Sequence, residues 1–149
     1  MGPRARLNDL SMSDGAERDE RIPASEEARA RRLLVVDDDP GVQELLAEVL
    51  SGAGYEVETA FDSVEAMERI AEGGYDGLVL DLVLPEEDGL ALYDRVLEVS
   101  PSLRDRVIFI SGEAREHQLR RVTRRTGAGV LLKPFNVLDL IQVLRERGL

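Results

Sequence analysis

A single carboxylate interrupts a dense apolar run of the sequence. Asp81 lies within Gly-Leu-Val-Leu-Asp-Leu-Val-Leu, residues 77–84, and Pro85 ends the run. Unbroken aliphatic residues are typical of a strand that is buried on both faces of a parallel sheet. A buried carboxylate without partners is disfavoured. We therefore expect Asp81 either to lie past the end of the strand in a polar pocket or to contact a positive charge.

Polar side chains also follow three other apolar segments, each at the point where the segment ends. These side chains are Asp37 and Asp38 after 33–36, Ser111 after 106–110, and Lys133 after 129–132. In doubly wound sheets, ligands bind at the carboxyl ends of the strands. The sequence therefore predicts one site that contains these four residues and Asp81.

The five side chains form a coherent chemical set. Carboxylates that lie close together repel one another and favour a hard divalent cation with oxygen ligands, which suits Mg²⁺. A cation, an ammonium group and a hydroxyl group are what an incoming phosphoryl group needs. With a carboxylate as the acceptor, the product would be an acyl phosphate.

The elements that must position this set alternate along the chain. Apolar segments that predict strands are 33–36, 55–60, 77–84, 106–110 and 129–132. A helix is predicted after each strand, with Asp39, Asp62 and Asn136 as N-caps of the first, second and fifth. We expect an α/β fold, a doubly wound five-stranded parallel sheet with helices on both faces.

Helical spacing predicts which apolar residues face the sheet. They are Val42, Leu45, Leu46, Val49 and Leu50 in the first helix, Val64, Met67 and Ile70 in the second, Leu90, Tyr93, Val96 and Leu97 in the third, and Val137, Leu140, Ile141 and Leu144 in the last. Leu138 and Val143 lie off the last of these stripes and could belong to a dimer or partner face.

The fourth predicted helix, from about Glu113 to Thr126, differs from the others. Its only large aliphatic residues are Leu119 and Val122, so it should be weakly anchored. Its other conspicuous residues are Arg115, Arg120, Arg121, Arg124 and Arg125, interpreted as a solvated surface rather than a docking face, and His117, which we expect to be exposed and not a phosphodonor.

Composition excludes several classes of protein. The 149 residues include no cysteine, which removes thiol catalysis and cysteine-based zinc sites and fits a reducing compartment. Residues 1–32 hold seven arginines and seven acidic residues, so the remainder carries the whole net charge of −11 and should not bind nucleic acid. The apolar runs are far shorter than the roughly 18 to 20 residues that cross a membrane. We expect a cytoplasmic protein.

Residues 1–32 form a charged leader that also contains Gly, Ser and Pro. We expect this leader to be disordered or partly helical, with a short helical turn from Ser25, before a domain at 33–149. Met12 is an alternative start of the chain.

Taken together, the strand-end motifs resemble those of the receiver domain of bacterial two-component response regulators. The motifs are Val-Val-Asp-Asp-Asp-Pro at 35–40, the lone Asp81 before Leu-Val-Leu-Pro with Asp-Gly downstream, Ser-Gly-Glu at 111–113 and Lys-Pro-Phe at 133–135. The resemblance covers about 33–148. Lys133 is the only lysine among 19 basic residues, and it falls at the lysine position of this family.

The resemblance implies the flavodoxin-like strand order 2-1-3-4-5 and makes Asp81 the phosphoacceptor. It further implies that Asp38 binds Mg²⁺ directly, together with Asp81 and the backbone carbonyl of Val83. Asp37 would bind the ion through water.

Two more roles follow from the same resemblance. Ser111 would hydrogen-bond the phosphoryl group after its arrival. Lys133 would pair first with Asp81 and then with the phosphate, and its peptide bond to Pro134 would be cis.

The resemblance also implies partners. The phosphoryl group would come from a histidine kinase or a histidine phosphotransfer protein, and self-catalysed acceptance and loss would be the only catalysis. No output domain follows the last helix, so we expect a stand-alone receiver. It would act on an unidentified downstream partner through its last two helices and fifth strand, and it could form a homodimer.

Three positions depart from the family pattern or tune it. Many relatives carry an aromatic residue three positions before the lysine, where this chain has Val130. Val130 has no ring to move beside Ser111, so the usual switch between hydroxyl and aromatic groups is in doubt. Val83 and Glu113 occupy positions that flank the phosphate in this family.

The sequence also bears on three other functions. A haloacid-dehalogenase-like phosphatase needs a second Asp two residues after its nucleophile, where this chain has Val83. A nucleotide-binding flavodoxin-like protein needs a Gly-rich or Ser/Thr-rich phosphate loop after the first strand, which is absent. A receiver-like interaction module that takes no phosphate remains open because of Val130.

Overall fold

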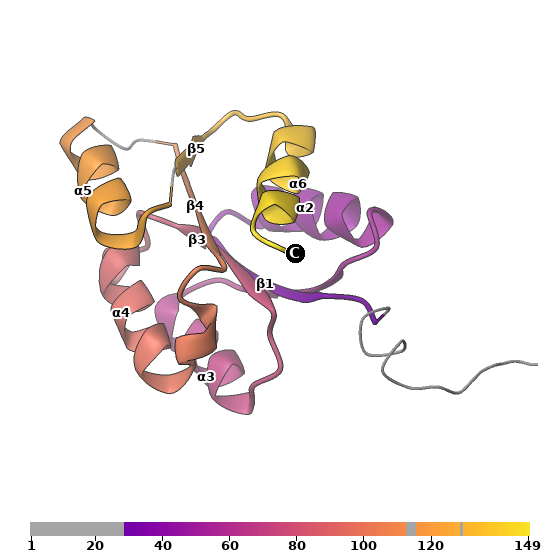
Figure 1. Ribbon diagram of the computed structural model, residues 1–149, viewed down its shortest axis with the longest axis horizontal. Helices are drawn as coiled ribbons and strands as arrows, with labels where there is room; N and C mark the ends of the chain where they lie inside the picture. The colour runs from indigo at the N-terminus through magenta and orange to yellow at the C-terminus, as the bar shows by residue number, and fades with distance from the viewer. Residues whose placement is uncertain (1–28, 113–115, 129) are drawn as a thin grey trace, which may run out of the picture. The chain divides into compact units, whose positions relative to one another are not determined.

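Five short strands pair side by side in one parallel sheet, seen in a computed structural model of the chain (Figure 1). The structure describes residues 29–112, 116–128 and 130–149. The chain divides into two units, Met1–Ala30 and Arg31–Leu149, and the sheet belongs to the second. Its strands are β1 (Arg32–Val36), β2 (Glu56–Ala60), β3 (Gly77–Asp81), β4 (Val107–Ser111) and β5 (Val130–Leu132). Their order is β2-β1-β3-β4-β5, which confirms the predicted doubly wound sheet and its strand order.

Most helices begin directly after a polar side chain that accepts hydrogen bonds from the first turn. Asp39, Asp62, Asp88 and Asn136 accept from main-chain N–H groups of α2, α3, α4 and α6. Such acceptors satisfy N–H groups that a helix leaves unpaired at its start. The helices are α2 (Pro40–Gly52), α3 (Ser63–Glu72), α4 (Gly89–Val99), the short 3-10 helix η1 (Pro101–Leu103), α5 (Glu116–Thr126) and α6 (Val137–Glu146). The predicted caps Asp39, Asp62 and Asn136 are confirmed.

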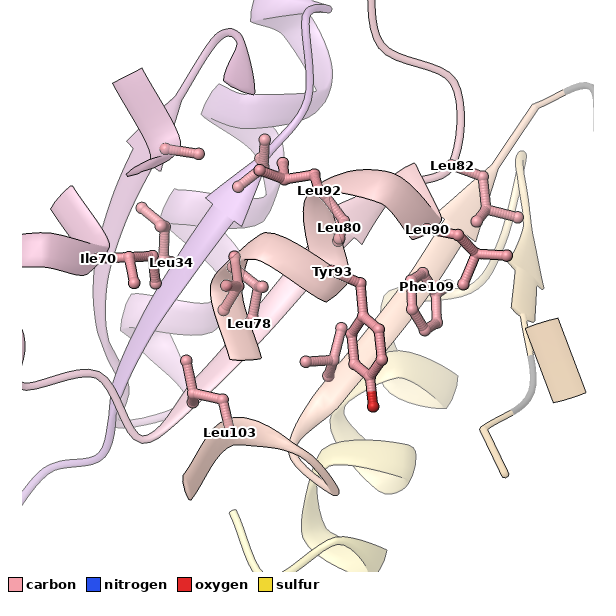
Figure 2. Packing of buried hydrophobic residues seen from close by; sticks show 14 of the residues in the cluster. Leu34, Ile70, Leu78, Leu80, Leu82, Leu90, Leu92, Tyr93, Leu103 and Phe109 are labelled. Carbon is pink, nitrogen blue, oxygen red and sulfur yellow. The ribbon is translucent and has the colours of Figure 1, made fainter. Parts of the chain in front are cut away.

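The sheet is buried on both faces because successive strand side chains point to opposite sides. One face carries Leu33 and Val35 of β1 and packs against Leu46 of α2 and Leu140 of α6. The other face packs against α3, α4 and α5, and Figure 2 shows part of this cluster around Tyr93 and Phe109, with members Leu34, Ile70, Leu78, Leu80, Leu90, Leu92 and Leu103. Each face of the sheet is therefore covered by one buried cluster.

Three predictions about which helix residues face the sheet are wrong. Val64 of α3 is 61% exposed, because Ser63 takes the inward position and its hydroxyl donates to Glu86. Leu45 of α2 is 50% exposed, since the buried stripe of that helix includes Gln43 instead. Val143 of α6 was expected off the stripe, yet it is partly buried against the core, whereas Leu138 is exposed as predicted.

The α5 helix is weakly anchored, as its composition predicted. Val122 is its one buried residue among those that the structure describes, and Leu119 is half-buried. The predicted start of this helix at Glu113, the start of the fifth strand at Gly129 and the helical turn at Ser25 lie outside the described residues. Over the described part of the chain, every helix is too short or too polar to span a membrane.

Candidate functional site

The pairing of β1 with β3 brings two strand-end carboxylates together. Val36 lies beside Leu80 in the register of these strands, so Asp37 and Asp81 follow at the same edge of the sheet. Carboxylate oxygens of Asp37, Asp38 and Asp81 all lie within 4.8 Å of one another. The predicted cluster of three acids is therefore present.

Burial sets the electrostatics of this cluster. Asp37 is fully buried and Asp81 is 5% exposed, whereas Asp38 is exposed. Burial raises the pKa of Asp81 above its usual value, and the nearby negative charge of Asp37 adds to the rise. A hydrogen bond from the Val83 N–H group and the charge of Lys133 oppose it. The free carboxylate is consequently held in an unfavourable environment, which an additional cation would relieve.

Lys133 supplies the positive charge that the apolar run around Asp81 requires. Its ammonium nitrogen lies 2.7 Å from Asp37 Oδ2 and 3.2 Å from Asp81 Oδ2. Burial alone would lower the pKa of Lys133, but its contacts with Asp37 and Asp81 outweigh burial and raise it. The peptide bond between Lys133 and Pro134 is cis, as the resemblance implied. Of the two alternatives for Asp81, the contact with a positive charge is confirmed, whereas Asp81 is the last residue of β3 and does not lie past its end.

One oxygen of Asp37 is left without a hydrogen bond by the described residues. Asp37 Oδ1 accepts from the Asp39 N–H group at 2.9 Å, but the buried Oδ2 has no hydrogen-bond donor there. This oxygen instead forms an ion pair with the ammonium group of Lys133, at 2.7 Å. One ammonium group is set against three neighbouring carboxylates, so negative charge remains in excess, and oxygen ligands of this kind suit a divalent cation. The donor set, three carboxylates against one ammonium group, therefore fits Mg²⁺.

Gln43 supports the site and was not anticipated from the sequence. Its buried side-chain amide donates to the backbone carbonyl of Asp37 at 2.8 Å and to that of Ala60 at 2.7 Å. It thereby ties the ends of β1 and β2 together beneath the acids. The available signal was spacing, since Gln43 precedes Leu46 and Leu50 by three and seven residues on one face of α2.

Ser111 lies at the same edge of the sheet. It is the buried last residue of β4, one position beyond Ile110, which pairs with Asp81. Its carbonyl accepts from the Lys133 N–H group at 2.8 Å. The predicted hydroxyl and the predicted ammonium group therefore belong to neighbouring strand ends.

Two backbone contacts and one side-chain contact fix the loop after β3 close to Asp81. Val83 N–H donates to Asp81 Oδ1 at 2.9 Å, and Val83 pairs with Asp88 in an isolated antiparallel bridge. Gly89 N–H donates to the Leu82 carbonyl, and a Cβ atom on Gly89 would lie 2.5 Å from the Asp81 carbonyl oxygen. Only glycine fits this approach of two backbones.

The other residues singled out in the sequence have the following positions in the structure. Asp39 caps α2, which confirms its interpretation as a cap. His117 is exposed, as expected. Val130 is half-buried in β5, and Glu113 lies outside the described residues. The arginines of α5 are not simply solvated: Arg121 and Arg125 form ion pairs with two acids of the α4 region, Asp88 and Asp94.

Fold and site together define a class of protein, namely doubly wound α/β domains whose carboxyl edge holds acids around one lysine for phosphoryl transfer. The family model of the response regulator receiver domain matches residues 33–145. The chain belongs to this family of two-component signalling domains. Receiver domains typically bind Mg²⁺ at an acidic cluster and are not conventional enzymes.

Proteins similar to this chain include both short and long response regulators. The chain is 35% identical to the response regulator receiver protein CpdR of Brucella abortus over 117 residues, which cover 78% of this chain and 95% of CpdR. It is 32% identical to the transcriptional regulatory protein DltR of Streptococcus agalactiae over 116 residues, 78% of this chain but only 51% of DltR. The chain thus spans about half the length of that relative.

A solved structure shows the same architecture. The response regulator TrrA of Thermotoga maritima, solved in complex with Mg(2+)-BeF, is similar to this chain with a TM-score of 0.68 and 28% sequence identity. The similarity covers 78% of this chain and 98% of TrrA.

Proposed function

We propose that Asp81 accepts a phosphoryl group from a histidine kinase or a histidine phosphotransfer protein in a Mg²⁺-dependent reaction. The observation that carries this proposal is the position of Asp81 at the end of a buried strand, 3.2 Å from the ammonium group of Lys133 and beside two further acids. Phosphorylation would then change the binding of a downstream partner.

The acids divide the work of holding the metal. Asp38 and Asp81, with the backbone carbonyl of Val83, are proposed as direct ligands, and Asp37 as a ligand through water. Bound Mg²⁺ would neutralise charge on the phosphoryl oxygens during transfer. The excess of three close carboxylates over the one ammonium group of Lys133 supports a cation in this pocket.

The side chains of the protein carry the transfer itself. A carboxylate oxygen of Asp81 attacks phosphorus, the bond from phosphorus to the donor imidazole nitrogen breaks, and that nitrogen keeps the electron pair. Lys133, which neutralises Asp81 in the free protein, then pairs with the phosphoryl oxygens. Ser111 would donate its hydroxyl proton in a hydrogen bond to one of those oxygens. Water attack on the acyl phosphate later returns inorganic phosphate.

Relatives support this assignment. TrrA was solved with Mg(2+)-BeF, in which beryllofluoride stands in for a phosphoryl group, and it shares this fold at 28% identity. We extend both features, a metal and a phosphoryl-like group at the strand ends, to the corresponding edge of this chain.

The test is phosphorylation by a small donor. The wild type and Asp81→Asn are incubated with acetyl phosphate and Mg²⁺, and the intact masses are measured. The wild type should gain the mass of one phosphoryl group and Asp81→Asn none. Asp39→Asn is the matched control, because it changes an adjacent acid and keeps a residue that caps helices well.

Each contrary result has a definite meaning. An unlabelled wild type under conditions that label TrrA would refute the proposal and favour an interaction module that takes no phosphate. Labelling of Asp81→Asn would move the acceptor elsewhere. Turnover of general phosphomonoesters would favour a phosphatase.

The cellular location of this reaction and the surface that binds a partner are also proposals. We place the protein in the cytoplasm, where histidine kinases present their phosphorylated domains, and the absence of cysteine fits a reducing compartment. The downstream partner, or a second copy of the chain, would bind through α5, β5 and α6, where Leu132 and Leu138 are exposed.

A further inference from the structure

Two ion pairs join α5 to the α4 region. The helix buries only Val122 among its described residues, but it forms two ion pairs with the α4 region. Arg121 donates to Asp88 Oδ2 at 2.9 Å, and Arg125 donates to both carboxylate oxygens of Asp94, at 2.6 and 2.7 Å. Figure 1 shows α4 and α5 on the same side of the sheet. A helix with one buried anchor depends on such contacts more than a well-packed helix does.

The first of these ion pairs continues to the acceptor. Asp88 pairs through its backbone with Val83, and the Val83 N–H group donates to Asp81 Oδ1. The Asp88 carboxylate divides its oxygens, because Oδ1 accepts from the Leu90 N–H group at the start of α4 and Oδ2 accepts from Arg121. A continuous series of contacts therefore connects the Asp81 carboxylate to α5.

The space between the loop and α5 is closely filled. Leu82 and Leu90, at the two ends of the loop, are buried and lie near Phe109 (Figure 2). A cavity of about 10 Å³ lies between the loop and α5, with Arg121 and Val122 in its lining. This volume is close to that of a single water probe, so the loop and α5 pack closely at this point.

The second ion pair offers a comparison within the same two helices. Asp94 lies six residues beyond Asp88 along α4, and none of its described contacts reaches the loop after β3. Arg125 lies four residues beyond Arg121, on the same side of α5. The two pairs resemble each other in chemistry and exposure but differ in their connection to the acceptor.

We propose that Arg121 is a positioning residue for the acceptor: its ion pair with Asp88 holds the loop that presents the Val83 amide to Asp81, and the same link carries changes at Asp81 to α5. This inference rests on the proposed phosphorylation of Asp81. Phosphorylation turns the Asp81 carboxylate into a mixed anhydride, and the carboxylate oxygen that accepts from Val83 becomes a neutral carbonyl oxygen. The hydrogen bond from Val83 is then no longer charge-assisted, which loosens the loop. Coupling between two sites is reciprocal, so α5 in turn influences the acceptor. No aromatic side chain is needed, which suits a chain with Val130 in β5.

The experiment compares two matched pairs of variants. Arg121→Gln and Asp88→Asn break the link, and Asn still caps α4. Arg125→Gln and Asp94→Asn break an equally exposed ion pair that has no described contact with the loop between Asp81 and Asp88. For each variant, amide exchange of Val83 and of α5 is measured by NMR, first in the free protein and then with Mg²⁺ and beryllofluoride. The rate of labelling by acetyl phosphate is measured in parallel.

In the free protein, Arg121→Gln and Asp88→Asn should speed exchange of the Val83 amide by about fivefold, the lower end of measured couplings. Both should slow labelling by a similar factor and abolish the effect of beryllofluoride on α5 exchange. Arg125→Gln and Asp94→Asn should stay within about twofold of the wild type in all three measurements, since measured couplings begin near fivefold.

Equal Val83 exchange in Arg121→Gln and Arg125→Gln would overturn the inference, and this comparison needs no phosphorylation. A wild type that is not labelled refutes the proposed function instead, and the Val83 comparison still decides the role of Arg121. If beryllofluoride changes α5 exchange equally in the wild type and Arg121→Gln, the link to α5 is refuted.

Discussion

Two groups of charged side chains lie on the same sheet. At the carboxyl edge, Asp37, Asp38 and Asp81 surround one ammonium group. In the second, here called the amino-edge group, Glu58 in the middle of the outer strand β2 meets several donors, among them Arg32 at the amino end of β1. These donors are the Tyr75 hydroxyl, Arg32 at 2.6 Å and Arg69 at 3.3 Å.

The pKa of the carboxylate Glu58 and that of the carboxylate Asp81 are shifted in opposite directions. The hydrogen bond from the Tyr75 hydroxyl, with Arg32 and Arg69, lowers the pKa of Glu58 below its usual value. Burial and the hydrogen bond to Glu58 raise the pKa of Tyr75 to about 12. Burial raises the pKa of Asp81 instead. The amino-edge group is closed in the sense that its opposite charges pair with one another, although the buried Nε atom of Arg69 has no hydrogen-bond partner among the described residues. The carboxyl-edge group has an excess of negative charge and suits a ligand.

The comparison implies that different forces hold the two groups. Opposite charges hold the amino-edge group. Like charges at the carboxyl edge repel, so the sheet and the loop after β3 must hold them in place. A variant that disrupts the loop after β3 should leave the group around Glu58 intact. A variant that removes the charge of Glu58 should leave the carboxyl-edge acids in place.

The largest effect should come from Gly89→Ala. The added Cβ atom would lie 2.5 Å from the Asp81 carbonyl oxygen and 2.8 Å from Leu82 Cα, and neither backbone atom can rotate away. We expect a loss of about 3 kcal/mol of unfolding free energy in urea titrations, together with loss of labelling by acetyl phosphate. Gly52→Ala is the control, since its Cβ atom would meet nothing within 4 Å. Equal stability of both variants would show that the loop does not hold the acids.

A smaller loss should follow Glu58→Gln. Glutamine keeps the shape of the side chain but removes the charge that binds Arg32 and Arg69. The site is partly exposed, so we expect a loss of about 1.5 kcal/mol, measured by urea unfolding near neutral pH. Glu56→Gln is the control, because its side chain is 64% exposed and its one ion pair, with Arg32, should contribute little. Labelling of Asp81 should be unchanged in both variants.

The contribution of Glu58 should depend on pH. Its folded-state pKa is lowered, so the stability it adds is fully present above the unfolded pKa of about 4.3 and is lost as the pH falls through the folded pKa. The difference in unfolding free energy between the wild type and Glu58→Gln should therefore be largest near neutral pH and shrink in acid. A difference that grows on acidification would contradict the assignment of a closed group.

The smallest effect on stability should come from Asp38→Asn. Asp38 is exposed and its charge is one of three that repel, so the metal-free variant should stay within about 0.5 kcal/mol of the wild type. Stabilisation by Mg²⁺ in thermal melts should fall sharply, because a direct ligand is lost. The control is Asp39→Asn, which should keep the response to Mg²⁺. An unchanged Mg²⁺ response in Asp38→Asn would remove this residue from the metal site.

The sequence predicted the strand ends well because the rule behind them is local. Aliphatic runs that stop at Asp37, Ser111 and Lys133 define where three strands end, and parallel strands end at one edge. The run around Asp81 continues to Leu84, so the predicted strand 77–84 was too long, and β3 ends at Asp81. The strand order and the meeting of three acids with the only lysine followed from that pattern and from the resemblance.

Contacts between elements were harder to predict. The pairing of Arg121 with Asp88 joins residues 33 positions apart and depends on how α4 and α5 cross, which helical periodicity does not define. The outward position of Val64 reflects the contact of Ser63 with Glu86, a residue of another loop. The closed group around Glu58 likewise needs β1, β2 and α3 to be placed first.

Lys133 lies between Asp37 and Asp81, and no other lysine is present in the chain. Reductive methylation with ¹³C-formaldehyde would therefore label this one side chain besides the terminal amine, and the dimethylated nitrogen keeps its positive charge. Its methyl resonance would report metal binding, phosphoryl arrival and phosphoryl loss from the centre of the site. A spectrum with a single side-chain signal can thus follow the whole signalling cycle of this protein.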